Sequence, residues 1–107
     1  MTFLRAGVRI PVELPAQVSW KNRAGKPRRA TGKTAMMSGN GLFVAVHLRL
    51  PHETAVSITV NLPLELTKVP LQLLCHGRVV RQEKSETLSG IGATIDEYHF
   101  RPAQRPV

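Results

Sequence analysis

PVELPAQVSW, residues 11–20, is the stretch that best indicates how this chain folds. Its even positions, from Val12 to Trp20, are apolar, whereas Glu13, Gln17 and Ser19 between them are polar. Because successive side chains of a strand point to opposite faces, a period of two puts one face on a core. The stretch therefore predicts a half-buried β-strand with Trp20 among its core residues.

The rest of the chain repeats this strand pattern between turn residues. We expect five more strands in KTAMMS (33–38), GLFVAVHL (41–48), AVSITVNL (55–62), PLQLLCHGRVVRQ (70–82) and GIGATI (90–95). No long amphipathic helix pattern is present. RPAQRPV, residues 101–107, has two prolines and no apolar period, which predicts a frayed tail. Six short strands at these intervals predict an all-β fold, either a small antiparallel barrel or a sandwich.

Length and composition indicate one folded module with an unusual charge. The chain has 107 residues, no internal repeat and no change of composition along its length, so we expect a single domain over residues 1–107. Fifteen Lys and Arg residues stand against seven Asp and Glu residues, a formal net charge of +8. This excess favours an anionic partner such as a nucleotide, a nucleic acid or an acidic protein.

The single cysteine and the absence of long apolar segments indicate the compartment. Cys75 lies in the apolar run LQLLCHGRVV, where a buried thiol acting as a small hydrophobe is expected, and one cysteine cannot form an internal disulfide. No segment approaches the ~20 apolar residues of a membrane span, and the first residues lack the apolar core of a signal peptide. We expect a soluble, cytoplasmic protein with no membrane span.

The histidines and the cysteine, which could act as metal ligands or catalytic groups, are not spaced for either role. The four histidines have no metal-ligand spacing with Cys75: they are His47, His52, His76 and His99. Cys75 and His76 are neighbours on an expected strand, so their side chains point to opposite faces and cannot act as nucleophile and base. We therefore expect no catalytic residue, no metal site and no cofactor.

A basic segment runs from Lys21 to Lys33 and also contains Arg23, Lys26, Arg28 and Arg29. Small β-barrels can bind single-stranded nucleic acid, but such proteins add exposed aromatic side chains on which bases stack. The only aromatic residue near this segment is Trp20, which the alternation assigns to the core. We therefore favour a solvated hairpin that attracts anions, and we expect no nucleic-acid binding.

Two arginines precede the first expected strand. Arg5 and Arg9 in RAGVR point the same way if the chain is extended, about 13 Å apart, and come closer in a turn. A guanidinium pairs bidentately with phosphate oxygens or with the O6 and N7 edge of guanine. Taken alone, the pair favours a solvated basic amino terminus over an anion site.

Three stretches together resemble the PilZ domain in order and spacing: LRAGVRIPVELPAQVSW, MSGNGLFV and GRVVRQE with GIGATI. PilZ domains carry RxxxR before the first strand, and Arg5 and Arg9 match it. They also carry an Asp or Asn followed by xSxxG on the turn after the second strand. Ser38 and Gly41 match this motif, whereas Met36 occupies its first position in place of the Asp or Asn. MSGNG by itself is also what a plain turn looks like.

The resemblance implies a six-stranded antiparallel β-barrel and, for many members, a bacterial receptor for the second messenger cyclic di-GMP. It implies ligand contacts by Arg5, Arg9, Ser38 and Gly41, and it leaves Met36 as a departure that weakens or replaces a contact. Two functions remain open. One is a single-domain receptor that relays the signal to a partner protein, and the other is an adaptor of pilus or motility machinery that has lost the ligand.

The resemblance also carries expectations about order and stoichiometry. Residues 1–10 are expected to form a mobile clamp that becomes ordered when ligand binds. Members that take up a stacked ligand dimer carry one more arginine directly before RxxxR. Leu4 occupies that position here, so we expect one ligand per chain.

Overall fold

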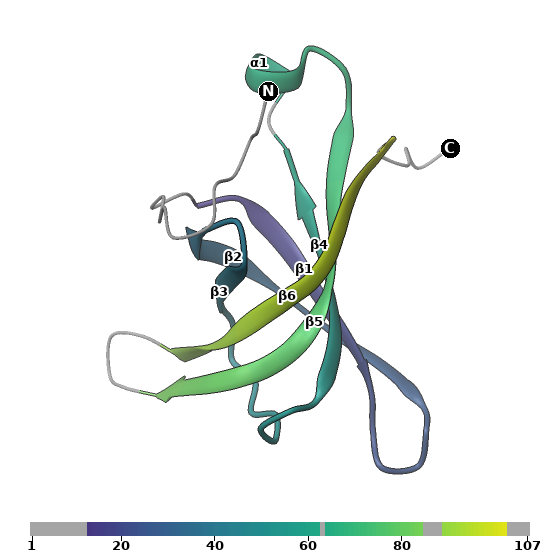
Figure 1. The fold of residues 1–107 in the computed structure, drawn as a ribbon, viewed down its shortest axis with the longest axis vertical. Helices are drawn as coiled ribbons and strands as arrows, with labels where there is room; N and C mark the ends of the chain where they lie inside the picture. Colours follow the sequence, from purple (N-terminus) through teal and green to yellow (C-terminus); the bar gives the residue numbers. More distant parts are fainter. Residues whose placement is uncertain (1–12, 63, 85–88, 103–107) are drawn as a thin grey trace.

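Six strands close into an antiparallel barrel in the order β1-β2-β3-β6-β5-β4, in a computed structural model that describes residues 13–62, 64–84 and 89–102 (Figure 1). The elements are β1 (Pro15–Lys21), β2 (Pro27–Met37), β3 (Gly41–Ala45), β4 (Ala55–Asn61), the short helix α1 (Leu64–Thr67), β5 (Leu71–Lys84) and β6 (Ser89–Pro102). The expected six-stranded antiparallel barrel is confirmed. Because β1 pairs with both β2 and β4, the sheet closes on itself.

The barrel interior is filled by the aliphatic side chains that the alternation assigns to one face. Val18, Ile58, Leu73 and Ile91 come from four different strands and have no exposed surface. Burying each such side chain contributes about 1.5–3 kcal/mol. Cys75 is also buried, and its burial raises the pKa of the thiol to about 12, so the thiol stays neutral near pH 7.

The hairpin between β1 and β2 is longer than the sequence indicates. β2 begins at Pro27 rather than near residue 33, so Arg28 and Arg29 lie in the strand, opposite Trp20 and Ser19. The turn is confined to five residues, in which the Lys26 amide donates to Asn22 Oδ1 at 2.9 Å. Backbone pairing with β1 does not depend on apolar side chains, which is why a polar, basic stretch continues the strand.

Trp20 is half-buried and packs against the aliphatic cluster instead of lying within it, which corrects the expectation that it is a core residue. The physical reason is its position near the end of β1, where the hairpin leaves the barrel and its partner Arg28 is exposed. The six cations of the basic segment are all exposed, as a solvated hairpin requires: Lys21, Arg23, Lys26, Arg28, Arg29 and Lys33.

The C-terminal strand extends further than expected. Arg101 and Pro102 belong to β6 and pair with Gln72 and Leu71, and Arg101 Nε donates to Gln72 Oε1 at 3.2 Å. Arg101 and Pro102 are therefore strand residues and not part of the expected tail, whose other residues, 103–107, lie outside the described residues. Within the part of the chain that the structure describes, no helix combines the length and the apolar character needed to cross a membrane.

Candidate functional site

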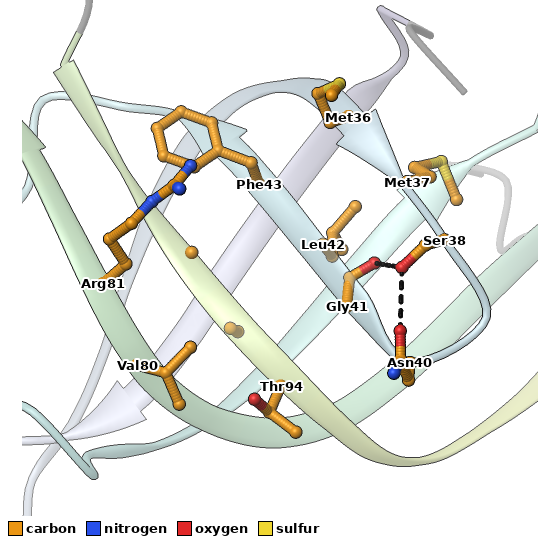
Figure 2. Close-up of a pocket in the computed structure, with 12 residues that line it drawn as sticks. Met36, Met37, Ser38, Asn40, Gly41, Leu42, Phe43, Val80, Arg81 and Thr94 are labelled. Carbon is orange, nitrogen blue, oxygen red and sulfur yellow. Dashed lines mark hydrogen bonds between the residues drawn. The ribbon is translucent and has the colours of Figure 1, made fainter. Parts of the chain in front are cut away.

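A hollow of about 420 Å³ lies on the outside of the barrel, across the four neighbouring strands β2, β3, β6 and β5 (Figure 2). The side chains that give it chemical character are Met36, Ser38, Asn40, Phe43, Arg81 and Thr94. Small-molecule sites typically have volumes of roughly 300–1,000 Å³ and combine apolar walls with a few polar groups. The hollow has the size and the lining of such a site.

The turn between β2 and β3 forms one polar wall of the hollow. The Ser38 amide donates to the Gly41 carbonyl at 2.9 Å, which closes the turn. The Ser38 hydroxyl lies 3.1 Å from Asn40 Oδ1 and 3.3 Å from the Gly41 carbonyl oxygen, and its one hydrogen can serve either acceptor (Figure 2). The turn therefore holds a hydroxyl and an amide side chain at the edge of the hollow.

Met36 reaches the outer face because β2 contains a bulge. Thr34 pairs with Val44 and Met36 pairs with Phe43, so Ala35 is an extra residue in β2. If the strand alternated regularly from Thr34 to Met36, the Met36 side chain would point inward, as the buried Thr34 side chain does. Because of the bulge, the Met36 side chain points outward, is 38% exposed and lines the hollow.

Phe43 lies on the outside of the barrel yet is 6% exposed. The space for its ring comes from two glycines of β6. A Cβ built at Gly90 would lie 2.8 Å from Phe43 Cε1, and one at Gly92 would lie 3.6 Å from Phe43 Cδ2. The glycines of GIG, interpreted from sequence as strand and turn residues, both lie in the strand, and together they seat the aromatic ring against the sheet.

Arg81 covers this ring from β5. Its guanidinium carbon lies 5.3 Å from the centroid of Phe43, the geometry of a cation–π contact (Figure 2). A second bulge puts it there: Val79 pairs with Ala93 and Arg81 with Gly92, so Val80 is an extra residue. Regular alternation would have turned Arg81 inward with Val79, which is buried. The pattern of GRVVRQ therefore assigns Arg81 to the wrong face.

The structure brings Met36, Ser38 and Gly41 together on the hollow, as their spacing in the sequence suggests. Arg5 and Arg9, together with the clamp expected over residues 1–10, lie outside the described residues. Phe43 and Arg81 are the residues that sequence reasoning missed. The GIG spacing was the only signal for Phe43, since paired glycines in a strand mark close approach of another group.

Elsewhere on the barrel, Cys75 and His76 point to opposite faces, as expected. Cys75 is buried, whereas His76 points outward and its Nδ1 lies 2.9 Å from Ser57 Oγ. Among residues 13–62, 64–84 and 89–102, no three or more His, Cys, Asp or Glu side chains gather so that they could hold a metal ion.

Comparison with known proteins shows what the chain is similar to. No protein-family model matches the chain, and no curated protein matches it. Among solved structures, the chain is similar to the crystal structure of the PilZ domain of CeSA from a cellulose-synthesizing bacterium. The two share 27% identity with a TM-score of 0.54, over 82% of this chain and 80% of that one.

Proposed function

We propose that this chain, which is a PilZ-like domain, binds the bacterial second messenger cyclic di-GMP and relays that signal to a partner protein. PilZ domains are ligand-binding and adaptor domains rather than enzymes, and the family includes cyclic di-GMP receptors. The observation that carries the proposal is that the xSxxG residues Ser38 and Gly41 line a ligand-sized hollow on this barrel.

The chemistry of the hollow supports a guanine nucleotide. Cyclic di-GMP has two planar bases with hydrogen-bonding edges and two phosphates that carry negative charge. Ser38 and Asn40 supply donors and acceptors for a base edge, while Phe43 and Arg81 supply apolar and cationic surface. The formal net charge of +8 favours the approach of an anion.

Arg5 and Arg9 complete the proposed site. They precede β1, and we assign them to the phosphates and to a guanine O6 and N7 edge, which a guanidinium pairs with bidentately. In this proposal the segment that carries them closes over the ligand when it binds.

A second candidate function is an adaptor that has lost the ligand and acts through protein contacts. Met36 is the observation that favours it, because a thioether is a weak acceptor where an Asp or Asn would accept strong hydrogen bonds. A thioether can nevertheless pack against a purine face. The intact RAGVR motif favours the receptor.

Calorimetric titration with cyclic di-GMP at physiological salt distinguishes the two functions. We expect binding with about one equivalent per chain and new amide protection at residues 3–10 and 36–41. Arg5→Ala and Arg9→Ala should each weaken binding by about ten- to a hundredfold, since a hydrogen bond to a charged group contributes ~1.5–3 kcal/mol.

Arg29→Ala is the matched control, because Arg29 is exposed in the β1–β2 hairpin and does not line the hollow. It removes the same charge and should leave the affinity nearly unchanged. A wild-type protein that does not bind would support the adaptor. Equal losses in all three variants would mean that overall charge, and not a clamp, attracts the ligand.

A further inference from the structure

We propose that Arg81 is a base-stacking residue of this site, which presents one face of its planar guanidinium to a purine while the other face lies over Phe43. The inference rests on the proposed function for the identity of the purine. It adds to the site a residue that lies in neither the RxxxR motif nor the xSxxG motif.

The backbone holds Arg81 in place before any ligand arrives. The bulge at Val80 turns its side chain outward, and Gly90 and Gly92 let the ring of Phe43 lie against the sheet beneath it. A side chain that is already oriented loses less conformational entropy on binding than one that must be ordered. Arg81 therefore offers a preformed surface at one end of the hollow.

The guanidinium remains accessible to a ligand. The side chain of Arg81 is 61% exposed, and its ion pair with Glu83, whose Oε1 lies 3.6 Å from the Arg81 Nε, is exposed as well. None of the residues that line the hollow is acidic. The cation is thus only partly compensated where the ligand would bind.

The arrangement favours stacking over a simple charge contact. A guanidinium is planar and weakly hydrated, and it stacks on aromatic faces, whereas a lysine ammonium is a compact, strongly hydrated charge. The guanidinium carbon already lies within cation–π distance of Phe43, 5.3 Å from the ring centroid. A purine on the second face would extend this stack, and the polar turn that carries Ser38 and Asn40 lies across the same hollow (Figure 2).

The test compares Arg81→Ala and Arg81→Lys in the full chain, by titration with cyclic di-GMP at several salt concentrations. If the planar guanidinium of Arg81 stacks on a base, both variants should bind the ligand roughly five- to a hundredfold more weakly than wild type. This is the range found when a base-stacking side chain is removed. For Arg81→Lys the slope of affinity against salt should stay close to that of wild type, since the positive charge beside the ligand is retained.

Arg78→Gln is the matched control, because Arg78 lies three residues earlier on β5, is exposed and does not line the hollow. Its affinity should equal that of wild type. Phe43→Leu removes the ring beneath Arg81 without removing charge and should also weaken binding. Combined with Arg81→Ala, it should add less than its separate effect, because the two side chains form one stack. Thermal unfolding checks that each variant keeps the fold.

The outcomes separate this inference from the proposed function. Wild-type affinity in Arg81→Lys, with weak binding in Arg81→Ala, would replace stacking by a charge contact and overturn the inference. Unchanged affinity in both variants would exclude any role of Arg81. In either case the receptor function would stand. Failure of the wild-type protein to bind would overturn the receptor function and, with it, this inference.

Discussion

Arg78 and Arg81 lie three residues apart on β5 and both have substantially exposed side chains, yet their surroundings differ in kind. Arg78 donates from Nε and Nη2 to the two oxygens of Asp96 at 3.2 and 3.1 Å, and from Nη1 to Glu53 at 3.1 Å. These bonds, those to Asp96 above all, raise the pKa of Arg78 above its ordinary value. Arg81 instead covers an aromatic ring beside an open hollow.

A β-bulge produces the surroundings of each of the two arginines. β6 has an extra residue, Asp96, between the partners of His76 and Gly77, and β5 has an extra residue, Val80, between the partners of Ala93 and Gly92. Asp96 is an outward carboxylate within reach of Arg78, and the second bulge turns Arg81 outward. The pairing of the strands therefore decides whether an arginine is held between two carboxylates or lies over an aromatic ring beside the hollow.

The largest expected effect comes from removing the space beneath Arg81. Gly90→Ala would drive a methyl group into the Val44 carbonyl and to 2.8 Å from the Phe43 ring, so β3 and β6 would have to move apart. We expect a loss of about 2–4 kcal/mol in the free energy of unfolding, measured by urea denaturation.

Gly25→Ala is its control, since Gly25 has a positive φ of 77° but nothing within 4 Å of a Cβ. Its cost should be backbone strain alone, about 1 kcal/mol. If Gly90→Ala costs no more than this, the ring of Phe43 is not seated tightly against β6, and the distinction between the two arginines loses its structural basis.

A moderate effect is expected from giving the hollow the carboxylate that it lacks. Met36→Asp restores the residue of the motif at a position that is 38% exposed. It should strengthen cyclic di-GMP binding by at most about tenfold, because a new acceptor for a guanine N–H edge is partly offset by desolvation of the carboxylate. Calorimetric titration measures the change.

A weaker affinity in Met36→Asp would contradict this expectation. It would mean that the thioether itself contacts the ligand, and that the departure from the motif is an adaptation of this site. Met36→Ala would then also bind more weakly than wild type, since it removes the thioether without adding charge.

The smallest effect is expected at the braced arginine. Arg78→Gln removes the ion pairs to Asp96 and Glu53, which are exposed and therefore screened by water and salt. Thermal unfolding should show a slight loss of stability at low ionic strength that shrinks as salt is added. A loss that is large and independent of salt would mean that these pairs hold the chain near Glu53 against β5 more firmly than exposed ion pairs do.

The sequence by itself determined that the chain forms six strands, that the fold is all-β, and part of the candidate site, whereas the bounds of β2 and β6 differ from the expectation. The alternation that begins at Ala16 and Val18 predicts which faces are buried, because burial of aliphatic side chains depends mainly on local pattern. The spacing of Met36, Ser38 and Gly41 predicts that they share one site, because the three lie on a single strand and the turn that follows it.

Only the tertiary structure decided which side chains join them. A bulge is a mismatch in the count of residues between two paired strands, so no window of one strand contains it. Regular alternation would place Arg81 inward with Val79, and no pattern within β3 places Phe43 over the glycines of β6. The six strands follow from their own composition, whereas the closed barrel and its hollow follow from how strands distant in sequence pair with one another.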